Sequence, residues 1–212
     1  LDEPYLAILP GRVAAAAVEA VSRLEPAHLA WAEAPCEGLA LNREYDRDTP
    51  PLEEVLREEW RPARPEHTDT TCQVLKAVAA DGRLIGLASS FGCHPVVCCQ
   101  ECRWIHGDFP GVASHLLERE NPGAVALFLQ GALGDINSAV VHKPEKESLA
   151  ALAVWAERYA RSVRSGLAAA RPLAEGPVRA ARLEKRFSRV PVPPDELRRL
   201  LAEQEALIER PG

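Results

Sequence analysis

The sequence predicts an α/β fold in which a mixed β-sheet is flanked by helices. Residues 71–91 form two strand-like runs around Asp81-Gly82, a dipeptide typical of a tight hairpin turn. A helical pattern over Phe109–Glu120 and a short apolar run, Ala124–Leu129, follow the hairpin, and a long Ala-rich amphipathic pattern then covers Lys146–Ala170. A hairpin followed by helix, strand and helix indicates a sheet with both antiparallel and parallel neighbours.

The segments before the hairpin are a helix, a strand and a loop. Tyr5–Leu24 has apolar residues at helical spacing and much alanine, and Pro26 lies just beyond it, so we expect a helix. Leu29–Ala34 is expected to form a short strand. Asp46–Thr68 is rich in Pro, Glu and Arg and predicts an exposed loop, with a short helix where Leu52–Trp60 shows an apolar period.

The remaining elements follow from local patterns as well. Cys72–Val78 alternates and predicts the first hairpin strand, and Arg83–Phe91 predicts the second. This second strand and Ala124–Leu129 are short apolar runs bounded by Gly or Pro, so we expect both to be buried. Downstream, Val178–Val190 predicts a strand with alternating basic residues, and Pro193–Arg210 predicts a final helix with an acidic first turn.

The composition is that of an ordinary globular protein. The 212 residues are 47% hydrophobic and 26% charged, which suffices for a sizeable core. The net charge of −6 argues against non-specific binding to nucleic acid or to anionic membranes. No continuous apolar run approaches the ~20 residues of a membrane helix, so we expect no transmembrane segment.

The start of the chain and its cysteines add two expectations. The sequence has no Met and begins at Leu1, which predicts a fragment or processed product holding a single incomplete α/β domain over 1–212. Four of the six cysteines lie within ten residues, unlike the spread spacing of a disulfide framework. This distribution favours reduced thiols and a cytoplasmic location.

Three polar clusters adjoin the predicted strands and helix. Gly92–Pro95 and Gln130–Ser138 each follow a predicted strand, and Gly107–Gly111 leads into the helix after the hairpin. Side chains at the carboxyl ends of strands in an α/β sheet commonly meet in one crevice. We therefore expect the three clusters to form one site.

Several residues of these clusters have both a chemical and a structural interpretation. His94 can be a metal ligand or a general base, because its pKa lies near neutrality, or a histidine satisfied within the core. Asp108 lies at a helix entrance, where a helix cap is the stronger interpretation. The Gly-rich turn after the second strand would display Asp135, Asn137 and Ser138, although it lacks the Walker A and dinucleotide spacings.

A second constellation could bind zinc. Cys98, Cys102 and His106 are spaced four residues apart and offer soft ligands, with Cys93 or Cys99 as a possible fourth. The chain has no CxxC pair with a second pair at the usual distance, so a loop with incidental cysteines is the competing interpretation.

Four short motifs, in their order along the chain, resemble the N-terminal catalytic domain of the neutral/alkaline non-lysosomal ceramidase family. They are Asn42-Arg43, the hairpin strand with its terminal histidine (Leu84–Pro95), Asp-x-Pro-Gly (Asp108–Gly111) and the Gly-rich turn (Gln130–Ser138). The resemblance covers about residues 5–170, and 171–212 would continue the domain with a strand and a helix. The chain is more similar to bacterial ceramidase-like proteins than to authentic ceramidases.

This resemblance implies zinc-dependent hydrolysis of an amide bond in a ceramide-like lipid or another N-acyl substrate. The family holds one zinc ion with two histidines, a glutamate and a tyrosine. His94 matches one histidine, and the other ligands would lie outside this sequence, so we expect the chain alone to be inactive. Zinc would lower the pKa of its bound water and polarise the acyl carbonyl. Asp108 and Asp135 would hold the turns around the site.

The family also implies roles for the polar residues near the metal. Arg43, Asn42 and Gly134 would bind substrate, and Arg43 and Asn137 would orient it or stabilise the oxyanion during catalysis. Ceramidases present a serine where Asn137 stands here, with Ser138 one place later.

Two alternatives remain open at this point. The substitution at Asn137 allows a catalytically degenerate relative that keeps the fold. The cluster of Cys98, Cys102 and His106 allows a structural zinc-binding module, and a Cys-rich loop after the histidine departs from the family pattern.

Overall fold

The computed structural model of the chain describes residues 3–46, 50–98, 105–141, 143–177, 179–188 and 191–208. By internal contacts the chain divides into two compact units, Leu1–Ala174 and Glu175–Gly212. The helices are α1 (Glu3–Ser22), α2 (Leu52–Val55), α3 (Asp108–Glu120), α4 (Glu145–Ala169), α5 (Pro194–Ile208) and a 3-10 turn, η1 (Pro65–His67). The strands are β1 (Ala27–Pro35), β2 (Ala40–Asn42), β3 (Thr71–Ala79), β4 (Leu84–Phe91), β5 (Val125–Gln130), β6 (Ile136–Ser138) and β7 (Arg171–Pro172).

A five-stranded sheet in the order β5-β4-β3-β1-β7 forms the centre of the first unit. β3 and β4 form an antiparallel hairpin with Gln73 opposite Ser90, and β1 lies antiparallel to β3. β4 and β5 are parallel, with Gly86 opposite Val125, and α3 lies between them in sequence. The hairpin turns at Gly82, whose φ of 88° glycine adopts without strain. The predicted mixed α/β sheet is therefore confirmed.

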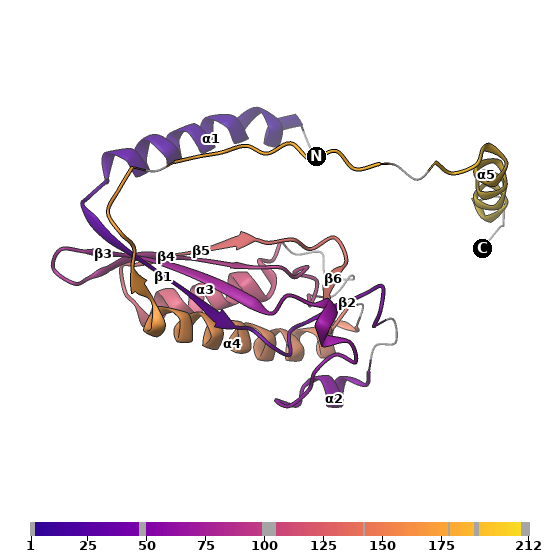
Figure 1. Ribbon diagram of the computed structural model, residues 1–212, viewed down its shortest axis with the longest axis horizontal. Coiled ribbons are helices and arrows are strands. Elements are labelled where there is room, and N and C mark those ends of the chain that lie inside the picture. Colours follow the sequence, from indigo (N-terminus) through magenta and orange to yellow (C-terminus); the bar gives the residue numbers. More distant parts are fainter. Residues whose placement is uncertain are drawn as a thin grey trace. The chain divides into compact units, whose positions relative to one another are not determined.

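Helices α3 and α4 cover one face of this sheet and pack against each other (Figure 1). α4 lies on β1 and β3, and α3 lies on β5. Along β1 the burial alternates, with Ala30, Ala32 and Ala34 buried and their neighbours exposed. Trp155 and Tyr159 of α4 are at most 1% exposed. The core therefore lies between the helical layer and this face of the sheet.

The opposite face of the sheet remains largely exposed and apolar. Trp31 is 39% exposed and Leu127 is 55% exposed, and the register places Leu75 and Ala88 between them. The prediction that Ala124–Leu129 is a buried strand is therefore wrong. Along β5, Ala126 and Phe128 pack against the core on the helix-covered face, whereas Val125, Leu127 and Leu129 are exposed on the uncovered face.

Helix α1 confirms the predicted N-terminal helix, and it is also a weak candidate for a membrane span. Its side chains from Pro4 to Ser22 are exposed, and this segment is long and apolar enough to cross a membrane by length and composition. The core helix of a soluble protein and a signal sequence can have the same length and composition. The segment does not read as a continuous apolar run because Pro10, Gly11 and Arg12 interrupt it.

The second unit contains α5, as predicted, but no strand among the described residues 179–188. The alternating basic residues of 178–190 suggested a strand. A strand is stable only when a neighbouring strand completes its hydrogen bonds. The described part of the second unit supplies no such neighbour.

A small two-stranded sheet, β2 with β6, was not predicted. The strands are antiparallel, with Ala40 opposite Ser138 and Asn42 opposite Ile136, and all four of these residues are buried. This sheet joins the Asn-Arg motif to the Gly-rich turn, which are separated by more than ninety residues in the sequence.

The close approach of α4 to β3 makes Gly166 a sensitive position. A Cβ atom there would lie 2.5 Å from Cγ2 of Val74, which is fully buried. We expect Gly166→Ala to lower the free energy of unfolding by about 1–2 kcal/mol, because overpacking outweighs the gain in helix propensity. Urea denaturation measures this. Gly11→Ala, where nothing lies within 4 Å, is the control and should cause no loss; equal effects would contradict the packing argument.

Candidate functional site

The site is built at the carboxyl ends of β4 and β5. Phe91 and Gln130 are the last paired residues of the two strands, and Gly131 N donates to Phe91 O at 3.0 Å. A Cβ atom at Gly92 would lie 2.6 Å from the carbonyl oxygen of Ala132. Glycine is therefore required where the two strand-end loops touch backbone to backbone.

His94 is held where the loop after β4 meets β6. Its backbone N donates to Ile136 O at 3.0 Å, and a parallel bridge sets it beside Asn137. Both side chains are half-buried. The structure thus brings together His94 and Asn137, which the sequence placed in separate clusters.

The Asn-Arg motif contacts the Gly-rich turn directly. Asn42 is 3% exposed, and its Nδ2 donates to Oδ2 of Asp135 at 2.7 Å. Arg43 donates from Nη2 to Gly134 O at 2.6 Å and from its backbone N to Asp135 O at 2.8 Å. Four of the predicted site residues therefore form one bonded group, with Asn42 beneath the surface and the other three exposed.

A cleft of about 350 Å³ opens beside this group. Asp135 lines it, and the rest of its lining consists of His67, Asp69, Thr71, Gln73, Ser90, Phe91, Gly92, Gly131, Ala132 and Ile136. No sequence motif marks His67, whose ring stacks on that of Tyr45 with 3.9 Å between centroids. No motif marks Gln73 or Ser90 either, because only the strand register pairs these two residues.

Asp108 holds a loop as well as the first turn of a helix. It is 5% exposed with a φ of 51°, and it is the first residue of α3, which has no side-chain cap at Gly107. Its carboxylate accepts from Cys98 N at 2.7 Å, Phe109 N at 2.7 Å and Val97 N at 3.3 Å. The carboxylate therefore satisfies an N–H in the first turn of α3, as the helix-cap interpretation expects, and it also ties the loop after His94 to the start of this helix.

The second predicted metal cluster is only partly described. Cys99 and Cys102 lie outside the described residues, and His106 accepts a hydrogen bond at Nδ1 from Asp108 N at 2.8 Å. Among the residues that the structure describes, no group of three or more His, Cys, Asp or Glu could hold a metal ion.

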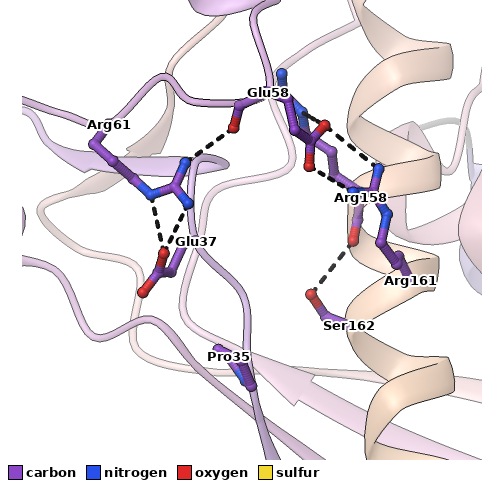
Figure 2. A pocket seen from close by; sticks show the side chains of 7 residues that line it. All are labelled: Pro35, Glu37, Glu58, Arg61, Arg158, Arg161 and Ser162. Atoms are coloured by element: carbon purple, nitrogen blue, oxygen red, sulfur yellow. Dashed lines mark hydrogen bonds and ion pairs between the residues drawn. The ribbon is translucent and has the colours of Figure 1, made fainter.

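A pocket of about 200 Å³ on the first unit has a different character. Figure 2 shows Arg61 reaching Glu37 and Arg161 reaching Glu58. Arg158 is 6% exposed, and burial lowers its pKa. Its guanidinium donates to four carbonyl oxygens, those of Gly38, Val55, Leu56 and Arg57. These hydrogen bonds hold the end of α2 against α4, so the charged residues around this pocket have a structural role.

Three thiols next to the site are buried and free. Cys36, Cys72 and Cys93 are at most 1% exposed. Desolvation raises the pKa of Cys72 to about 11 and raises those of Cys36 and Cys93 as well. Thiols that are buried and held protonated in this way are poor nucleophiles.

These thiols are expected to be inert in the folded chain. At pH 8, Cys36, Cys72 and Cys93 should resist alkylation by iodoacetamide and react after denaturation, as peptide mapping by mass spectrometry measures. Folding raises the pKa of Cys72 from 9.0 to about 11. The stability contributed by its neutral thiol is therefore fully present below pH 9 and is lost as pH rises toward about 11. Rapid alkylation of Cys93 in the native chain would contradict the expectation that this buried thiol is inert.

Comparison with known proteins supports this architecture. No protein-family model and no curated protein matches the sequence. The neutral ceramidase from Pseudomonas aeruginosa matches in structure with a TM-score of 0.56 and 22% identity, over 70% of this chain and 24% of that one. A ceramidase complexed with C2 matches with a TM-score of 0.54 and 21% identity, over 70% and 23%. The chain thus spans about a quarter of these proteins and has the fold of that part of a ceramidase.

Proposed function

We propose that this chain forms part of a zinc-dependent hydrolase that cleaves the amide bond of an N-acyl substrate, either a ceramide-like lipid or another N-acyl compound. The observation that carries the proposal is the convergence of His94, Asn137 and the Asn42–Asp135 pair at one end of the sheet. The ceramidase fold supports it. We further propose that residues 1–212 belong to one larger catalytic domain, and that the chain alone is inactive.

His94 suits the role of a zinc ligand. It is half-buried, and its backbone is fixed by a hydrogen bond to β6, so the imidazole is presented from a defined position. Because the described residues form no group of three metal ligands, the other ligands would come from outside them. Bound zinc would supply a Lewis acid that polarises the acyl carbonyl and lowers the pKa of water.

The remaining residues would bind and orient the substrate. Arg43 and Gly134 are exposed and bonded to each other, and Asn137 lies beside His94, so the three can face an acyl group together. Arg43 and Asn137 offer N–H donors toward a developing oxyanion. Asn42 is buried with its amide committed, so we assign it to holding Asp135 rather than to touching substrate.

Replacing His94 tests the proposal in the longer protein. We expect His94→Ala to abolish stoichiometric zinc binding and to reduce amide hydrolysis by more than roughly 100-fold, because a metal ligand is lost. Zinc content by elemental analysis and turnover of N-acyl lipids measure the two effects. His115→Ala, on the exposed surface of α3, is the matched control.

Three results would redirect the interpretation. If the His94→Ala variant keeps its zinc and its activity, His94 has no role in the chemistry. If zinc is lost only when Cys98 and Cys102 are both replaced by Ser, the metal is structural. Zinc binding at His94 without hydrolysis of any N-acyl substrate would indicate an inactive relative, as the asparagine at 137 allows.

A further inference from the structure

Gln130 is the last residue of β5, and its side chain crosses to the loop that carries His94. Its Nε2 lies 3.2 Å from Cys93 O, 3.3 Å from Phe91 O and 3.2 Å from Gly131 O. An amide nitrogen carries two hydrogens, so these three carbonyls share two donors. Two of the carbonyls belong to the chain entering His94, and the third begins the Gly-rich turn. One side chain thus links both strand-end loops.

The bond to Cys93 O matters most because of the geometry of the peptide unit. The carbonyl of Cys93 and the N–H of His94 belong to the same planar peptide group. Gln130 holds the carbonyl end at 3.2 Å, and Ile136 O accepts from the N–H end at 3.0 Å. The peptide plane before His94 is therefore fixed from both sides, which sets the direction in which its side chain leaves the backbone.

The surroundings of Gln130 indicate that it affects the orientation of His94 more than the stability of the fold. Its side chain is exposed, whereas the packing of the two loops is determined by Gly92 and Gly131, where a Cβ atom would come within 3.0 Å of the opposite backbone. Hydrogen bonds from an exposed amide exchange readily with water and contribute little net stability. Substituting Gln130 should therefore disturb the orientation of His94 much more than the fold.

We propose that Gln130 is a positioning residue for His94, which acts by holding the Cys93–His94 peptide group between the ends of β5 and β6. This inference rests on the proposed function for one point only, which is that His94 binds a metal. The tether itself is a property of the chain and can be measured without metal. Gln130 does not need to touch the substrate for this role.

The first test uses this chain and amide hydrogen exchange measured by NMR. Gln130→Glu keeps the shape and removes the donors, and Gln130→Ala removes the side chain without adding charge. Both should speed exchange of the His94 amide about three- to tenfold and shift its resonance, while the Leu75 amide in the middle of the hairpin stays unchanged. Gln204→Glu, at an exposed position of α5, is the matched control.

The second test uses the longer protein loaded with zinc. Gln130→Glu should weaken zinc affinity about 10-fold or more, because partners that orient a ligand typically contribute this much. It should lower kcat with little change in KM, and Gln204→Glu should do neither. A uniform loss of stability would instead alter the midpoint of denaturation without this split between kcat and KM.

The outcomes separate this inference from the proposed function. An unchanged His94 amide in both Gln130 variants overturns the positioning role, whatever the protein catalyses. Equal acceleration at His94 and Leu75 also overturns it, because Gln130 would then support the fold as a whole. A selective change at His94, in a protein whose wild type neither binds zinc nor hydrolyses amides, upholds the tether and refutes the hydrolase.

Discussion

The buried side-chain amide of Asn42 is the interaction on which the rest of the site depends. Its Nδ2 donates to Oδ2 of Asp135 at 2.7 Å and lies 3.3 Å from His67 O, and its Oδ1 accepts from Glu44 N at 3.0 Å. A buried polar group that lacks a hydrogen-bond partner destabilises the fold, so moving any partner of Asn42 away would cost stability. It joins three segments far apart in the sequence at one end of the sheet.

The small β2–β6 sheet carries this constraint to the residues of chemical interest. Asn42 pairs with Ile136 in that sheet, and Ile136 O in turn accepts the backbone N–H of His94. Gln130 holds the same peptide group from the side of β5. The position of His94 is thus determined by contacts from both sheets. Helices α3 and α4 form the core against one face of the five-stranded sheet.

Local patterns in the sequence predicted the helices, the hairpin at Gly82 and the mixed sheet, because each depends on periodicity or turn chemistry within a few residues. β2 and β6 could not be predicted in this way. Each has three residues, and pairing between Ala40 and Ser138 stabilises them rather than any local period. The exposure of β5 depends on which face of the sheet the helices cover, and the local sequence does not encode this. The order of the family motifs suggested that Asn42 and Asp135 belong to one site, but the contacts of Gln130 depend on loop geometry alone.

A double-mutant cycle between Asn42 and Asp135 would measure how strongly this hydrogen bond couples the Asn-Arg motif to the Gly-rich turn. Free energies of unfolding of the wild type, Asn42→Ala, Asp135→Ala and the double variant give the coupling energy. We expect a coupling energy of about 1.5–3 kcal/mol, the range of a hydrogen bond to a charged group. When Asp69→Ala replaces Asp135→Ala as the control, we expect the two effects to add within about 0.5 kcal/mol. A coupling energy near zero between Asn42 and Asp135 would contradict the dependence of the site on Asn42, since the Asn-Arg motif and the Gly-rich turn would then fold independently.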